Sequence, residues 1–244
     1  STETIQESGV NGSVYFFVDE FTNYNDLEIG QKAVLLFNKL GFGVKIVEHE
    51  VSGRTYISKG MLDEAKVCAE KNIALFENII SESTPLIGIE PSAILTFKDE
   101  YPKLLRGEAQ AKAKAISINC LTIEEFLYRA SKSINFSGYF TDAKKHVKVH
   151  VHCHQKALSN KQASQDILSI PLNYTSEIID SACCGMAGSF GYEKEHYEVS
   201  MQMGGLKLFP AVKGSSEAII LAAAGTSCRH QIKDGTDRSA KHPV

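Results

Sequence analysis

Hydrophobic and polar residues follow two alternating patterns along this chain. Short apolar runs that suit buried strands occur at 14–18, 44–47 and 86–89, and again at 147–151, 174–179 and 218–221. Longer stretches with apolar residues at helical spacing occur at 29–40, 58–80 and 91–105, and again at 161–168, at 192–208 and after 226. Strand and helix patterns that alternate in this way predict parallel sheets covered by helices.

The second half of the chain repeats the order of the first. Matching the patterns aligns 51–54 with 183–186 and 90–93 with 225–228, and it sets Phe16 or Phe17 roughly at the position of Cys153. The predicted fold is therefore α/β, with two pseudo-symmetric Rossmann-like halves, each a small parallel sheet flanked by helices. The predicted organisation is a polar N-terminal extension at 1–12, a first repeat without ligand cysteines at 13–120, a linker at 121–145 and a second repeat at 146–244.

Composition narrows the classes of function. The 244 residues carry a formal net charge of -3 and a pI near 6.2, so no nucleic-acid-binding surface is expected. No apolar run approaches the roughly 20 residues of a transmembrane helix, and no signal-peptide pattern opens the chain. We therefore expect a cytoplasmic location, with any membrane association arising through partners. The polar start without an initiator Met suggests a segment cut from a longer polypeptide.

Four of the six cysteines follow predicted strands of the second half: Cys153, Cys183, Cys184 and Cys228. Loops after parallel strands meet at one edge of a sheet, so these four thiols are expected to converge. Four thiolates are the number that a [4Fe–4S] cluster requires, and adjacent cysteines make a poor structural disulfide. The other two, Cys68 and Cys120, lie in apolar patterns and are interpreted as small core residues.

Neighbouring residues fit a second layer around such a centre. Gly185 allows the backbone to approach closely, and His154 and His230 are candidates for hydrogen bonds to cluster sulfur. Arg229 is a candidate for offsetting the cluster's negative charge. Zinc is the nearest alternative, because Cys₄ and Cys₃His sites are common, although the usual Cys-x₂₋₄-Cys pairs are missing here.

Three segments of the second half carry a family resemblance: Cys153–Leu158 (CHQKAL), Cys183–Glu193 (CCGMAGSFGYE) and Gly225–Ile232 (GTSCRHQI). They resemble the cysteine-rich CCG domain, which occurs in heterodisulfide reductase and in the iron–sulfur subunits of glycolate and lactate oxidases. Residues 21–26 and 54–60 are most similar to the C-terminal iron–sulfur region of large FAD-linked oxidases. The resemblance covers about residues 13 to 235.

The resemblance implies an iron–sulfur portion of an oxidoreductase that oxidises a 2-hydroxy acid of the D-lactate, glycolate or D-2-hydroxyglutarate type. Its four ligands would be the four second-half cysteines. Gln231 stands where fuller versions of the motif have another Cys, and the first repeat lacks every ligand, so one cluster is expected. No Gly-rich dinucleotide fingerprint occurs, so FAD is expected on another domain or subunit. That flavin domain, and a ferredoxin-like domain, are the candidate partners.

Two other functions remain open from the sequence alone. In a cluster-based thiol or disulfide reductase, a substrate sulfur would react at the metal. In a structural zinc-binding interaction module, the cysteines would only stabilise a fold. The chain by itself is not expected to oxidise a hydroxy acid, because its only concentrated chemistry is the set of thiols.

Overall fold

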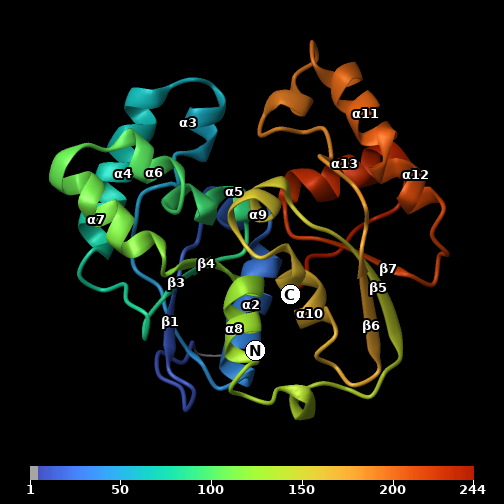
Figure 1. Cartoon of the computed structure of the whole chain (residues 1–244), viewed down its shortest axis with the longest axis horizontal. Helices are drawn as coiled ribbons and strands as arrows, with labels where there is room; N and C mark the ends of the chain where they lie inside the picture. The colour runs from blue at the N-terminus through green and yellow to red at the C-terminus, as the bar shows by residue number, and fades with distance from the viewer. Residues whose placement is uncertain (1–4) are drawn as a thin grey trace. The chain divides into compact units, whose positions relative to one another are not determined.

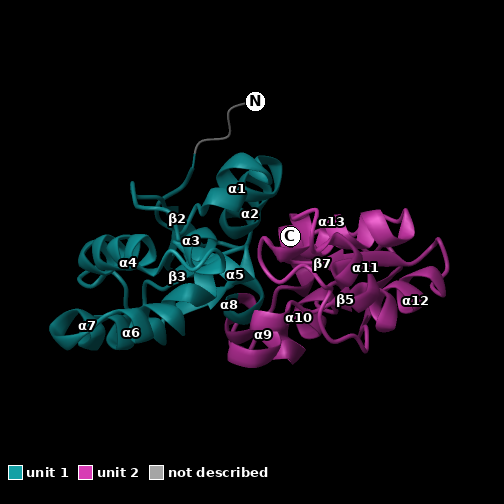
Figure 2. Ribbon diagram, turned by 90° about the horizontal axis from the view of Figure 1, so that it is seen from above, with its two compact units in different colours: residues 1–126, 244 teal, residues 127–243 magenta. Residues whose placement is uncertain are grey.

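The computed structural model describes residues 5–244 (Figure 1). The first four residues of the predicted N-terminal extension lie outside the described residues. The chain divides into two compact units (Figure 2), one ending at Phe126 and the other spanning Leu127–Pro243. Each unit contains its own parallel sheet.

Unit 1 holds a four-stranded sheet in the order β2-β1-β3-β4, with every neighbouring pair parallel. Its strands are β1 (Ser13–Phe16), β2 (Gly43–Lys45), β3 (Leu86–Gly88) and β4 (Cys120–Thr122). Its helices are α1 (Glu20–Tyr24), α2 (Leu27–Lys39), α3 (Arg54–Ser58), α4 (Leu62–Phe76), α5 (Pro91–Ile94), η1 (Leu95–Phe97), α6 (Glu100–Leu104) and α7 (Gly107–Ser117), and α8 (Ile123–Ala130) runs across the boundary.

Unit 2 holds a three-stranded parallel sheet in the order β6-β5-β7. Its strands are β5 (Lys145–His150), β6 (Tyr174–Ile178) and β7 (Ile220–Ala223). Its helices are η2 (Ser137–Tyr139), α9 (Cys153–Leu158), α10 (Lys161–Leu168), η3 (Phe190–Tyr192), α11 (Tyr197–Leu206), α12 (Leu208–Lys213) and α13 (Thr226–Thr236).

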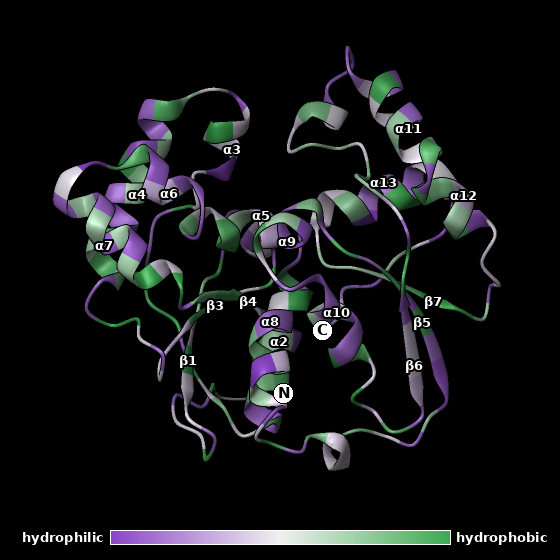
Figure 3. Cartoon of the chain, in the orientation of Figure 1, coloured by the Kyte–Doolittle hydropathy of each residue, from purple (hydrophilic) through white to green (hydrophobic). Residues whose placement is uncertain are grey.

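Strand β7 of unit 2 is covered on both faces, because its successive residues belong to different cores. Leu221 and Ala223 pack in a core with residues of α12 and α13, and this core contains Cys184 and Cys228. Ala222 packs in a second core, which α10 borders. Figure 3 accordingly shows β7 in hydrophobic green, whereas β6 at the opposite edge is mostly pale. Strands covered on both faces are typical of parallel α/β sheets.

The two units have the same strand order and the same pairing register. The order β6-β5-β7 in unit 2 corresponds to β2-β1-β3 in unit 1. In each unit, one residue of the middle strand pairs with a residue on both neighbouring strands. Tyr15 pairs with Lys45 and Leu86, and Lys148 pairs with Glu177 and Leu221. The predicted α/β fold with two Rossmann-like halves is confirmed.

The middle strands lead into helices that begin at equivalent positions. Asp19 is the N-cap of α1 and His152 is the N-cap of α9, and both lie four residues after the paired residues named above. Glu20 therefore occupies in unit 1 the position of Cys153 in unit 2. The sequence comparison placed Phe16–Phe17 there, which is wrong, because hydrophobic periodicity alone does not fix the register between two strands.

The loops after the second strands also correspond. Gly53 and Gly185 both have positive φ, at 75° and 103°, and both stand eight residues after paired strand residues. The register thus agrees with the expected match of 51–54 to 183–186. Glycine is favoured at both turns because other residues rarely adopt this conformation.

Three predicted helices are shorter or interrupted. The helix predicted at 58–80 starts only at Leu62, after Gly60 with φ 73°, and ends at Phe76. Pro102 and Pro210 lie in the first turns of α6 and α12, where their missing N–H groups cost no helical hydrogen bond. New helices therefore begin within the stretches predicted as continuous at 91–105 and 192–208.

Regular structure also occurs outside the predicted strands and helices. Gly107–Ser117 forms α7, which the hydrophobic pattern did not predict. The segment predicted as a linker at 121–145 includes the end of β4, α8 and η2. The described part of the N-terminal extension pairs with the edge of β2, where Val44 N donates to Gln6 O at 2.7 Å.

Candidate metal centre

Three loops of unit 2 carry the four cysteines, and each loop follows a strand. Cys153 is the first residue of α9, after β5. Cys183 and Cys184 lie in the loop after β6, and Cys228 lies in the first turn of α13, after β7. Since the three strands are parallel neighbours, their carboxyl ends bring these loops to one edge of the sheet.

The four thiols form a continuous series of contacts. Sγ of Cys184 and Sγ of Cys228 lie 3.4 Å apart. The side chain of Cys183 also interacts with those of Cys153 and Cys184, and these interactions shift the pKa values of the thiols. Cys184 and Cys228 are buried, at 5% and 1% exposure, whereas Cys183 is half-buried and Cys153 is exposed. The series therefore runs from the core of unit 2 to its surface.

The pKa values of the four thiols alternate along this series. Hydrogen bonds from Cys153 and Cys184 hold the pKa of Cys183 far below its ordinary value. A hydrogen bond from Cys184, then the charge of His152 and a hydrogen bond from His150, lower the pKa of Cys228 against the effect of burial. Cys153 and Cys184 have raised pKa values because each donates a hydrogen bond to a neighbouring sulfur and so keeps its proton. Four thiolates so close repel one another, and a bound cation removes that repulsion.

Gly185 contributes both a hydrogen bond and a close backbone approach. Its N–H donates to Sγ of Cys183 at 3.3 Å. A Cβ at this position would lie 2.2 Å from the carbonyl oxygen of Ser200. The candidate role for Gly185 beside the sulfurs is therefore compatible with its geometry, and a larger residue does not fit there.

Lys156 is a neighbour of the sulfurs that the sequence reasoning missed. Its Nζ donates to the carbonyl oxygens of Ser181 and Ala182, which precede the cysteine pair. Burial lowers the pKa of Lys156, and the four cysteine sulfurs act in the opposite direction. Lys156 thus braces the loop and adds a positive charge beside the thiols. No motif indicated this role.

The other three candidate neighbours differ in where their side chains go. His154 donates its backbone N–H to Nδ1 of His152 at 3.2 Å, and the two rings stack with centroids 5.2 Å apart. His230 forms a 2.7 Å hydrogen bond through Nδ1 with the hydroxyl of Tyr192. Arg229 donates to the carbonyl oxygens of Ala223 and Ala224, and so clasps the loop between β7 and α13.

Gln231 stands where fuller versions of the motif carry a further cysteine. Its side chain is buried at 2% exposure and donates to both the carbonyl oxygen and the hydroxyl of Ser200, at 3.0 and 2.9 Å. It therefore links α13 to α11. These contacts give Gln231 a packing role and explain its burial.

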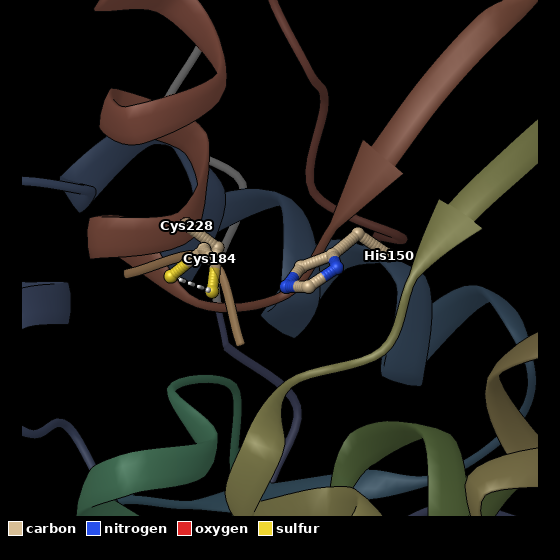
Figure 4. Close-up of side chains that lie close together, drawn as sticks. All are labelled: His150, Cys184 and Cys228. Carbon is tan, nitrogen blue, oxygen red and sulfur yellow. Dashed lines mark hydrogen bonds between the residues drawn. The ribbon is translucent and has the colours of Figure 1, made fainter. Parts of the chain in front are cut away.

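His150 is a second residue that the sequence reasoning missed. It is the last residue of β5, is 1% exposed, and lies with Cys184 and Cys228 in a group whose potential ligand atoms are all within 4.8 Å of one another. Figure 4 shows its ring directed toward the two sulfurs. Its position in the strand, pointing inward beside the later cysteines, is the signal that could have identified it.

A second group of potential metal ligands lies closer to the surface. His152, Cys153 and His154 also have ligand atoms within 4.8 Å of one another. Nδ1 of His152 accepts the backbone N–H of His154, as an N-cap does, and Gln155 Oε1 accepts the N–H of His152. The histidine at 152 is therefore explained by capping of α9.

Comparison with known proteins shows that the chain is similar to parts of longer dehydrogenases. It is 26% identical over 243 residues to D-2-hydroxyglutarate dehydrogenase of Pantoea ananatis, covering 99% of this chain and 23% of that protein. It is 29% identical over 233 residues to the D-2-hydroxyglutarate dehydrogenase of Escherichia coli K12, covering 93% of this chain and 21% of that protein. It is 25% identical over 244 residues to one of the subunits of anaerobic glycerol-3-phosphate dehydrogenase of Escherichia coli K12, covering 98% of this chain and 59% of that protein.

These matches support an oxidoreductase component, as the sequence predicted. No protein-family model matches the chain. The chain spans between 21% and 59% of the length of the three relatives named above. Among the helices of residues 5–244, none combines the length and the apolar character that crossing a membrane requires. The similarity therefore concerns a segment that recurs in differently named dehydrogenases.

Proposed function

We propose that this chain is the iron–sulfur electron-transfer portion of an FAD-linked oxidoreductase of the CCG type. The observation that carries the proposal is the unbroken series of four thiols from three neighbouring loops. Support also comes from the relatives, which are named as dehydrogenases and share nearly the whole length of the chain. Membership of the CCG family is part of this proposal.

The donor set suits a soft, multiply charged metal group. Four cysteine sulfurs are the ligands that [4Fe–4S] clusters use, and two of them already have lowered pKa values. The N–H of Gly185 supplies a hydrogen bond to sulfur, and Lys156 supplies a nearby positive charge. Cys153, Cys183, Cys184 and Cys228 are the residues that would hold the group, and a cluster bound there would supply one-electron redox capacity.

A single zinc ion is the second candidate occupant, and one distance favours it. A tetrahedral Zn²⁺ with sulfur ligands at about 2.3 Å has sulfur edges of about 3.8 Å. The 3.4 Å separation between the sulfurs of Cys184 and Cys228 is close to that value. Two thiolates on separate irons of a cluster stand farther apart, so cluster binding requires these two side chains to rotate. A zinc-stabilised interaction module is the function that follows from this alternative.

The proposed parent enzyme oxidises a 2-hydroxy acid at a flavin carried by another subunit or domain. D-2-hydroxyglutarate is the first substrate to test, because two of the relatives are named for it. D-lactate and glycolate are the next. Electrons would pass from the flavin to the centre in unit 2 and on to an acceptor, with a ferredoxin-like domain as a further candidate partner. We propose a cytoplasmic location for this assembly.

The first experiment identifies the occupant. The chain is purified without oxygen, reconstituted with iron and sulfide, and analysed for iron, sulfide and zinc. Four irons and four sulfides per chain, with an EPR signal after dithionite reduction, are expected. Stoichiometric zinc with no paramagnetic state under any reducing condition contradicts the electron-transfer function and supports the zinc module.

A second experiment tests the relay in the parent enzyme. The Cys228→Ser parent is mixed with substrate, and flavin bleaching is followed by stopped flow. Normal bleaching with lost reduction of the acceptor is the expected result, because the thiol site would carry electrons out and not take part in substrate oxidation. Lost bleaching with an intact flavin domain contradicts a relay and indicates a catalytic role for the cysteines.

A further inference from the structure

His150 is held on one side of its ring and faces two cysteines on the other. Nδ1 forms a 2.7 Å hydrogen bond with the hydroxyl of Ser181. Nε2 is buried and has no nitrogen or oxygen partner among the described residues. The ring is directed at the sulfurs of Cys184 and Cys228 (Figure 4), and a ligand atom of the ring lies within 4.8 Å of each.

The hydrogen bonds around Ser181 are compatible with a proton on Nδ1 of His150. The hydroxyl of Ser181 donates to the carbonyl oxygen of Ile179 at 3.4 Å. That hydroxyl can accept from Nδ1 of His150, and in the tautomer with the hydrogen on Nδ1 the lone pair is on Nε2. A histidine that donates through one nitrogen and presents the lone pair of the other is the usual form of a metal-binding histidine.

Unit 1 offers an internal comparison for this position. With the N-caps Asp19 and His152 aligned, the shared register makes Phe17 equivalent to His150, and His49 equivalent to Ser181. Phe17 stacks on His49 with ring centroids 4.2 Å apart. Unit 1 lacks the four cysteines, and at the position of His150 it has Phe17, which offers no nitrogen to a metal. The stacked rings of Phe17 and His49 occupy this part of unit 1. A histidine needed only for packing has no reason to change together with the cysteines.

We propose that His150 is a metal ligand, binding through Nε2 beside Cys184 and Cys228. The inference rests on the proposed function, since it requires a metal group in the site. Four cysteines and His150 make five donors, whereas a four-iron cluster and a tetrahedral ion each offer four protein-ligand positions. Cys153, the most exposed of the five, is the donor that the metal group can give up.

The test measures nitrogen bound to metal. The chain is labelled with ¹⁵N-histidine, reconstituted anaerobically with iron and sulfide, reduced, and examined by pulsed EPR. A coupling typical of a directly bonded nitrogen is expected in the wild type and in Cys153→Ser, and its loss is expected in His150→Phe. Phenylalanine is chosen because unit 1 carries Phe17 at the equivalent position in a packed core. His146→Phe, on the exposed part of the same strand, is the matched control and should keep the coupling.

A parallel titration uses Co²⁺ alone, so the result does not depend on cluster assembly. His150→Phe should bind Co²⁺ about 100-fold more weakly than the wild type, and Ser181→Ala about 10-fold more weakly, because Ser181 only orients the ring. Circular dichroism and thermal unfolding establish that each variant is folded.

Three results overturn the inference. They are a wild-type coupling too small for a bonded nitrogen, a coupling that persists in His150→Phe, and an unchanged Co²⁺ affinity in that variant. A wild-type chain that loads iron without nitrogen coupling contradicts only the role of His150. A wild-type chain that takes up neither iron, zinc nor Co²⁺ contradicts the proposed function as well.

Discussion

Unit 1 and unit 2 share an arrangement of three parallel strands, which we call the frame, but different contacts join the loops at the carboxyl ends of those strands. We call these contacts between loops the closure of each unit. In unit 1, the carboxylate of Glu20 accepts the hydroxyl of Ser52 at 2.6 Å and the backbone N–H of Ser52 at 2.9 Å. The equivalent residues in unit 2 are Cys153 and Cys184, whose sulfurs belong to the series of thiols. The same two loops are thus joined by hydrogen bonds in one unit and by sulfur chemistry in the other.

The comparison shows that unit 1 has the same strand order without the four cysteines of unit 2. Unit 1 reaches the same strand order and the same left-handed glycine at its second loop with oxygen donors and an aromatic pair. Strand pairing and burial therefore hold the frame, and the ligands are an addition at one edge. Removal of the metal site from unit 2 should abolish metal binding and leave the frame folded.

The largest expected effect comes from giving unit 2 the closure of unit 1. The double variant Cys153→Glu/Cys184→Ser should bind no iron, because it lacks a core thiolate, yet it should remain folded. The new carboxylate and hydroxyl stand where Glu20 and Ser52 pair in unit 1, so the double variant should unfold at a higher temperature than Cys184→Ser alone. Iron analysis and thermal unfolding measure the two effects. Cys68→Ala, whose thiol lies in the core of unit 1, is the control and should keep its iron.

The outcome that contradicts this picture is an unfolded double variant. It would mean that the metal group is part of the folding of unit 2 and that the likeness between the units is limited to their backbones.

The next largest effect is on the free energy of unfolding, and it differs between Gly185 and Gly53, which both have positive φ. Gly185→Ala should lower the free energy of unfolding by about 3 kcal/mol, because φ is strained and a Cβ would lie 2.2 Å from the carbonyl oxygen of Ser200. Gly53→Ala should cost only about 1 kcal/mol, since the nearest atoms to its Cβ are 3.4 Å away. Urea unfolding of the two variants provides the measurement. Equal losses would show that backbone strain alone decides both positions.

A pH-dependent effect is expected from Asp19, the N-cap of α1. Burial, then the charge of Glu90, raises the pKa of Asp19 to about 8. The folded state therefore holds this proton more tightly than the unfolded state, and stability falls as pH rises from about 4 to about 8, by at most about 1.4 kcal/mol per pH unit. Asp19→Asn cannot ionise and keeps an oxygen for the N–H groups of Phe21 and Thr22. It should be more stable than the wild type at pH 8.5, and the difference should shrink toward pH 5.

Urea unfolding at several pH values tests this expectation. His152, at the equivalent position of unit 2, carries no carboxylate, so His152→Asn serves as a comparison for exchange of the capping residue alone. Identical pH profiles for wild type and Asp19→Asn would contradict a raised pKa at Asp19.

The smallest expected effect concerns Lys156, which has no ionic counterpart in the closure of unit 1. Its charge stabilises the more negative, reduced form of a bound cluster. Lys156→Gln should therefore lower the reduction potential by about 50 mV, whereas Lys156→Arg should leave it nearly unchanged. Potentiometric titration followed by EPR measures the shift. A potential that moves equally in both variants would assign Lys156 to bracing the loop through Ser181 and Ala182 and not to electrostatics.

The hydrophobic pattern was sufficient for most of the frame. It located the strands β1, β3 and β5 to within a few residues, and helix α10 at 161–168. It failed where local chemistry interrupts a helix, at Gly60, Pro102 and Pro210, because a helical apolar period continues through a residue that breaks the helix. It also missed α7, whose apolar residues are mostly alanines and give little contrast between faces.

The sequence by itself determined that four cysteines follow strands of a repeated α/β unit, because the local hydrophobic pattern predicts where each strand ends and each loop begins. Only the tertiary structure decided which residues stand at equivalent places and which face the sulfurs. Strand pairing makes Glu20 of unit 1 equivalent to Cys153 of unit 2. Packing within unit 2 places His150 and Lys156 beside the thiols. Register and side-chain direction depend on contacts between segments far apart in the chain, and a one-residue shift in register turns a side chain to the other face of a sheet.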